Sequence, residues 1–171
     1  MKQILYVAVA FLSVGLGTSV SIAAATSNNM QIALMNDSSP VTQTTPNEKD
    51  EQAQMAAWLI ESAKVANDYV NMLDQGQYVQ SWTKGDQIFQ HTINKEEWTK
   101  ALNDNRKPLG KVKSRKLKDQ RPAMNPQGLP RGAYMVVEYD TSFEQAPNSG
   151  ELLTLRRGSD GVWRVLTYQV N

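Results

Sequence analysis

The chain has 171 residues, no cysteine and a formal net charge of +1 at pH 7. The absence of cysteine excludes disulfides, thiol nucleophiles and thiolate metal sites, so the fold depends on its own hydrophobic core. Because dedicated nucleic-acid binders carry a strong positive excess, the near balance of charge indicates that nucleic acid is not the partner. Any electrostatic role must therefore come from a local cluster of charges.

The first 25 residues have the layout of a secretory signal peptide. Lys2 supplies a positive start, Ile4 to Gly17 is an apolar run without charge, and small residues end at Ala25. A membrane-spanning helix needs about 20 apolar residues, which is more than this run provides. We therefore expect cleavage after Ala25, a periplasmic or secreted protein, and no membrane span after cleavage.

Residues 26–50 are predicted to form a flexible polar linker, because Ser, Thr, Asn, Gln and Pro dominate the segment. The remaining residues, 51–171, suit a single small domain that can bury a modest core. Loss of the signal peptide would remove one lysine and leave 17 basic residues against 17 acidic ones. The exported chain would then have a net charge near zero.

The folded part is expected to begin with helices. From Glu51 to Leu73, apolar residues recur at steps of three and four and fall into two stripes. A helix with such a wide apolar arc should be covered on more than one side. A second helix is expected from Gln77 to Phe89, although Gly85 within it costs about 1 kcal/mol relative to alanine.

The third helix has the clearest start signal. Asn94 stands at the N-cap position and Glu97 follows three residues later, which is the pattern of a capping box. Pro108 disfavours helical geometry at the residue before it. The helix is therefore expected to end near Arg106.

Four strands follow the helices, and "GSDG" between the last two has the residues of a tight hairpin. Alternation of apolar residues is most regular in the second of them. Helices followed by strands predict an α+β fold, in which a curved four-stranded antiparallel sheet wraps the long helix. The expected strands are Lys111 to Lys118, Ala133 to Phe143, Glu151 to Arg157 and Val162 to Val170.

No catalytic, metal-binding or cofactor-binding pattern is apparent. His91 is the only histidine and is expected to lie in an exposed loop, without further ligands at metal-binding spacing. Glu138 and Asp140 share one strand face, and we interpret them as its polar, solvent-facing side. Motifs for a serine nucleophile, a phosphate loop or a dinucleotide site are missing. The sequence therefore favours a non-catalytic role, predicts no cofactor and leaves enzymatic activity uncertain.

A basic run is the sharpest electrostatic feature. Eight basic residues and a single acid, Asp119, lie between Arg106 and Arg121. The run could bind an anionic envelope component or an acidic protein partner. It could also be a lysine-rich edge strand that prevents aggregation, and this is the favoured interpretation. Alternation predicts that three cations share one face, namely Lys111, Lys113 and Arg115.

Three hypotheses follow from these residues, and the third is a purely structural or assembly role through the sheet face. The first is an exported, non-catalytic binding or interaction domain whose contact surface comprises Arg106, Lys111, Lys113 and Arg115. The alternative is a small-molecule-binding protein or an unassigned enzyme, with an arginine that clamps an anion. Its pocket wall would be formed by Trp82, Trp98 and Tyr139, although the core is the favoured location for most of the tryptophans.

Three segments carry a resemblance to a known family: Gly76 to Trp82, Glu96 to Leu117 and Asp160 to Tyr168. Together they resemble a bacterial exported family catalogued as domain of unknown function 4019, over about residues 53–170. The resemblance implies no established activity and no catalytic residues, but Arg106 and Arg115 are the basic positions that match its pattern. The order of helices and strands is also similar to cystatin-like and nuclear-transport-factor-2-like rolls, which host many functions.

Overall fold

The computed structural model of the protein describes residues 46–171. The predicted signal peptide and most of the predicted linker lie outside this range. Helix α1 spans Pro46–Asp74, so residues 46–50 are helical and the predicted linker is too long by this segment. A proline is tolerated in the first turn of a helix, where its missing N–H has no intrahelical partner. No helix within the described residues is long and apolar enough to cross a membrane.

The single helix expected from Gln77 to Phe89 is instead two short helices, α2 (Tyr78–Lys84) and α3 (Gln87–Thr92). The chain is extended at Gly85, and the side chain of Asp86 caps α3 by accepting a hydrogen bond from the N–H of Ile88. A Cβ atom at Gly85 would lie only 2.5 Å from Cδ1 of Phe89. The glycine therefore breaks the helix and admits the Phe89 ring.

Helix α4 (Lys95–Asn105) begins with the predicted capping box. The side-chain oxygen of Asn94 accepts a 2.8 Å hydrogen bond from the N–H of Glu97, whose carboxylate accepts in turn from the N–H of Asn94. Arg106 is the C-cap residue, as expected, and the 3-10 helix η1 (Lys107–Leu109) follows it.

The sheet has four antiparallel strands, as predicted, and their order is β1-β2-β3-β4. Strand β1 pairs only with β2 and is an edge strand, but it extends well beyond the expected end at Lys118 because its second half also pairs with β2. The α+β class is thus confirmed. The strand bounds are β1 (Val112–Met124), β2 (Ala133–Phe143), β3 (Ser149–Arg157) and β4 (Trp163–Val170).

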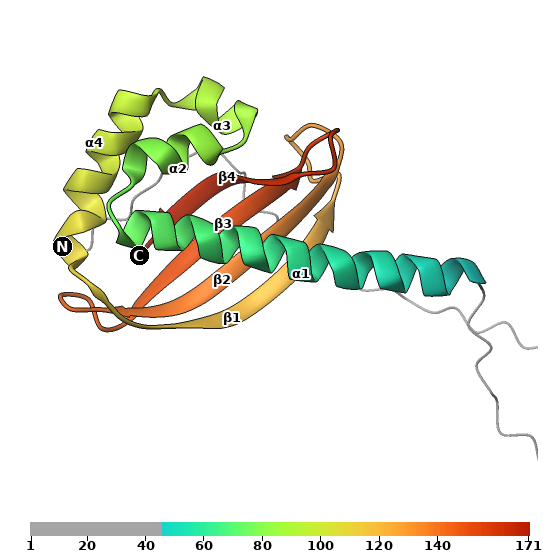
Figure 1. The fold of residues 1–171 in the computed structure, drawn as a ribbon, viewed down its shortest axis with the longest axis horizontal. Helices are drawn as coiled ribbons and strands as arrows, with labels where there is room; N and C mark the ends of the chain where they lie inside the picture. The colour runs from blue at the N-terminus through green and yellow to red at the C-terminus, as the bar shows by residue number, and fades with distance from the viewer. Residues whose placement is uncertain (1–45) are drawn as a thin grey trace, which may run out of the picture.

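Helix α1 lies across one face of the sheet and contacts all four strands, while α2, α3 and α4 cover one end (Figure 1). Trp58 packs edge-on against Trp163 of β4 at 5.9 Å, and the carbonyl of Leu59 accepts a 2.8 Å hydrogen bond from Gln120 of β1. Ile60, a member of the first predicted stripe, is 73% exposed, so this part of the helix is not covered on a second side as predicted.

Candidate functional site

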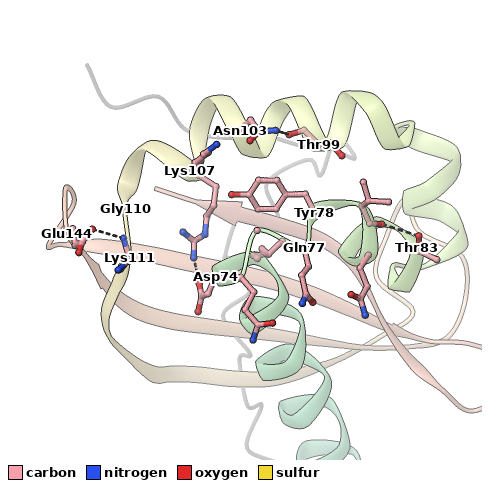
Figure 2. A pocket seen from close by; sticks show the side chains of 16 residues that line it. Asp74, Gln77, Tyr78, Thr83, Thr99, Asn103, Lys107, Gly110, Lys111 and Glu144 are labelled. Atoms are coloured by element: carbon pink, nitrogen blue, oxygen red, sulfur yellow. Dashed lines mark hydrogen bonds and ion pairs between the residues drawn. The ribbon is translucent and has the colours of Figure 1, made fainter.

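A polar groove opens where the C-terminal end of α1, the start of α2, α4 and the start of β1 come together (Figure 2). Its volume is about 910 Å³, at the upper end of the usual range for ligand sites. The side chains on its walls are mostly amides, hydroxyls and charges. The lining residues used below are Asp74, Gln75, Gln77, Tyr78, Val79, Gln80, Thr99, Asn103, Arg106, Lys107, Lys111 and Glu144.

The floor of the groove is an ion pair between Asp74, the last residue of α1, and Arg106. The Arg106 side chain is 3% exposed, and its guanidinium lies 4.4 Å from the ring centroid of Phe143. Arg115 of β1 binds the same aspartate with two hydrogen bonds, from Nη1 at 2.8 Å and from Nη2 at 3.0 Å. One carboxylate therefore holds two guanidinium groups from different elements.

A second carboxylate, that of Glu151, binds the same pair of arginines. Glu151 of β3 is fully buried and accepts a 2.6 Å hydrogen bond from Nε of Arg115. It also accepts hydrogen bonds from the hydroxyls of Thr141 at 2.6 Å and Tyr168 at 2.7 Å. Nε of Arg106 lies 3.7 Å from its Oε1 atom. We call Asp74, Arg106, Arg115 and Glu151 the charge network, in which two positive and two negative charges cancel.

The surroundings of the charge network shift the pKa of its members and neighbours. Burial by itself lowers the pKa of Arg115, but the hydrogen bonds and charges of Asp74 and Glu151 raise it above its ordinary value. Burial raises the pKa of Tyr168 strongly, and the negative charge of Glu151 raises it further. Arg115 therefore stays charged, and the Tyr168 hydroxyl stays protonated as a hydrogen-bond donor.

Tyr78 presents an unused hydroxyl to the groove. Tyr78 as a whole is 8% exposed, and its hydroxyl makes no hydrogen bond to any described residue. Figure 2 shows its ring between the groove walls, with the hydroxyl directed toward the end where Lys107 lies. Burial raises the pKa of Tyr78, while the charge of Arg106 opposes the shift and that of Asp74 adds to it. The group is thus a protonated donor available to a ligand.

The family model for proteins of unknown function DUF4019 matches residues 65–168. This is more than half of the chain. The protein belongs to the DUF4019 family. The matched range contains the whole charge network and all of the groove-lining residues named above. No curated protein matches the sequence.

In this DUF4019 protein, the two arginines singled out by the resemblance, Arg106 and Arg115, bind carboxylates of the protein itself. Both guanidinium groups are engaged by Asp74 and Glu151, so the predicted arginine anion clamp is already occupied by the protein's own carboxylates. The prediction that Lys111, Lys113 and Arg115 share one face is wrong. A bulge between Val112 and Ser114 interrupts the alternation and turns Arg115 inward, while both lysines are exposed.

Four exposed lysines lie between the end of α4 and the first half of β1, and we call them the basic surface. Two of them line the groove, whereas Lys116 lines a separate hollow with Glu138 and Asp140. No ion pair or side-chain hydrogen bond of the four lysines occurs within residues 46–171. Lys118, by contrast, is paired with Glu138 at 2.6 Å. The interpretation of β1 as a lysine-rich edge strand fits its position in the sheet. The basic surface consists of Lys107, Lys111, Lys113 and Lys116.

The three aromatic residues predicted to wall a cavity do not line the groove. Trp98 is fully buried and donates a 3.0 Å hydrogen bond to the hydroxyl of Ser81. Trp82 is half-buried and donates to the carbonyl of Ile93 at 2.8 Å, and Tyr139 is buried on β2. Trp98 and Tyr139 are thus core residues, and Trp82 packs against the core while partly exposed.

His91 is exposed, as expected, but lies within α3 and not in a loop. Across the described part of the chain, no group of three His, Cys, Asp or Glu side chains is arranged to hold a metal ion. Sequence reasoning missed Asp74, Glu151 and Tyr78 as site residues. Glu151 had a signal, since it occupies the same alternating positions of its strand as the buried Leu153.

Proposed function

We propose that the protein is an exported, non-catalytic binding domain whose basic surface contacts an anionic envelope component or an acidic partner. The observation that supports this most directly is the presence of four exposed lysines without partners in the described chain, beside two arginines that are paired with the protein's own carboxylates. Unpaired cations that follow closely on one another in the chain add local positive charge, which attracts anionic partners and accelerates association.

The proposed setting has two further parts. Export is supported by the signal-like N-terminal sequence, with cleavage after Ala25 and a periplasmic or extracellular location. A cystatin-like or nuclear-transport-factor-2-like roll is supported by a long helix packed on one face of an antiparallel sheet. Such rolls carry unrelated functions, so the function rests on the basic surface and not on the fold.

Removal of the four charges of the basic surface tests the proposal. A variant with all four lysines changed to glutamine should bind dextran sulfate and phosphatidylglycerol vesicles about tenfold or more weakly than the unchanged protein, the equivalent of about 1.4 kcal/mol. The binding of the unchanged protein should also fall as salt rises, because exposed charges are screened. Affinity is measured by titration at several salt concentrations.

A control variant removes the same number of charges from helices, at Lys49 and Lys64 of α1, Lys84 of α2 and Lys95 of α4. It should retain most of the affinity. Equal losses in both variants would show that only the net charge matters, and an unchanged affinity in the first variant would refute the proposal.

A further inference from the structure

The groove beside the basic surface presents hydrogen-bond donors that no protein group uses. Tyr78 offers its hydroxyl, and Lys107 and Lys111 each offer an ammonium group without a partner in the described chain. The charges of Asp74 and Arg106 on the floor neutralise each other. The remaining donors therefore favour a ligand that brings a carboxylate or another acidic group to this place.

The wall formed by the α1–α2 turn and the start of α2 carries side-chain amides and one exposed valine. The side-chain amides of Gln75, Gln77 and Gln80 have no hydrogen bond to any described residue and line the groove. Each amide can donate and accept at once, which matches the N–H and C=O groups of a polypeptide backbone. Val79 of the same wall is 50% exposed and offers an apolar contact for an aliphatic side chain.

These features distinguish between classes of anionic ligand. The lining contains no exposed aromatic face, because its one aromatic residue, Tyr78, has its ring buried. Glycans would lack a flat apolar surface for their sugar rings. A lipid surface requires a broad apolar face for insertion, which a single exposed Val79 does not provide. A peptide that carries acidic and aliphatic side chains uses every type of group present.

The groove is held in shape before a ligand arrives. Gly76 turns the chain after α1 with a φ of 70°, and the Asn103 amide donates to the carbonyl of Thr99 at 2.9 Å. At the other end, the N–H of Lys111 donates to the carboxylate of Glu144 at 3.0 Å. A preformed site reduces the entropy lost on binding. Glu144 lies beside Lys111 at that end, so Tyr78 and Lys107 form the more favourable position for an acidic ligand group and Lys111 the weaker one.

We propose that the groove binds an acidic segment of a partner protein in extended form. Tyr78, Lys107 and Lys111 contact its acidic side chains, and the glutamines of the α1–α2 turn contact its backbone. This inference rests on the proposed function, since it names the acidic partner and restricts the contact to the half of the basic surface that lines the groove.

The test uses two fluorescein-labelled octapeptides, one alternating Asp or Glu with Val, and one with Asn and Gln in place of the acids. Fluorescence anisotropy measures their affinity for the purified protein. The acidic peptide should bind at least tenfold more tightly than the neutral one. Equal affinity of the two peptides, or no binding of the acidic one, would overturn the inference.

Variants then locate the site. The double variant Lys107→Gln/Lys111→Gln should weaken binding of the acidic peptide about tenfold, and Tyr78→Phe about threefold, because each removes donors at the groove. The matched control Lys113→Gln/Lys116→Gln removes the same charge outside the groove and should change affinity less than twofold. Thermal unfolding confirms that each variant is folded.

The outcomes separate this inference from the broader proposal. If both lysine pairs weaken the peptide equally, or if Tyr78→Phe has no effect, the groove is not the site, whereas the basic surface still binds anions. If the groove variants bind dextran sulfate or vesicles more weakly but bind the acidic peptide with unchanged affinity, the ligand of the groove is not a peptide. Unchanged anion binding after removal of all four lysines would instead refute the proposed function itself.

Discussion

Arg115 reaches from edge strand β1 across β2 and donates a 2.6 Å hydrogen bond from Nε to the buried carboxylate of Glu151 on β3. The same guanidinium binds Asp74 at the end of α1. One side chain thereby connects the edge of the sheet, its interior and the long helix. This position explains why Arg115 differs from the lysines around it.

We expect Arg115→Met to destabilise the protein by ~3–5 kcal/mol, because Glu151 would remain buried with its main charge partner removed. The double variant Arg115→Met/Glu151→Leu should lose less than the sum of the single variants. Urea unfolding gives the three free energies. The exposed neighbour Lys113→Met serves as control and should stay within about 0.5 kcal/mol. Additive losses would show that the two residues do not interact.

Tyr168 should make the protein sensitive to alkali. Burial and the charge of Glu151 raise its pKa above the ordinary value of tyrosine, so the unfolded chain loses this proton first. Stability from this group is fully present below the unfolded pKa of about 10 and decreases as pH rises above it. The difference in unfolding free energy between the unchanged protein and Tyr168→Phe should therefore be constant up to about pH 9 and shrink above pH 10. A pH-independent difference would contradict this.

Asp160 should make the stability of the protein depend on pH in the acidic range. Hydrogen bonds from Arg164 and from the N–H of Val162 lower the pKa of this exposed carboxyl to about 2. The contribution to stability is present above the unfolded pKa and is lost as pH falls through about 2. Melting temperatures of the unchanged protein and Asp160→Asn should thus differ at pH 6 and converge near pH 2. The effect should be small, because the pair is exposed.

Gly85→Ala should destabilise the protein by ~1–3 kcal/mol, since the added methyl group would collide with the ring of Phe89. The backbone of Gly85 has a φ of −68°, which alanine adopts without strain, so the cost comes from contacts of the new methyl group, mainly with Phe89 and secondarily with the carbonyl of Trp82 at 3.2 Å. In a Phe89→Leu background the same substitution should cost clearly less. Chemical denaturation of the four proteins measures this, and an equal cost in both backgrounds would exclude the collision.

Export can be tested on the protein isolated from its own host. We expect an intact mass that corresponds to a chain starting at Thr26, after cleavage behind Ala25. Substitution of Ala23 and Ala25 by arginine should block processing, because signal peptidase requires small residues there. A protein that retains Met1 would show that the segment is not a cleaved signal.

Much of the fold could be predicted because its signals are local. The capping box of Asn94 and Glu97 marks the start of α4, and the alternation from Ala133 to Phe143 marks β2, as found. These patterns depend on neighbours three residues or fewer apart. The break at Gly85 was missed because it depends on the tight approach of Phe89, which no propensity scale contains.

The sequence by itself determined the α+β class, the antiparallel strands and the concentration of basic charge before and within β1. Only the tertiary structure decided what each charge does. The bulge at Lys113 sets the side on which Arg115 lies, and its partners Asp74 and Glu151 are 41 and 36 residues away in the chain. Such pairings form when helices and sheet pack together, so residue type and local spacing could not separate a structural arginine from a lysine free to bind a partner.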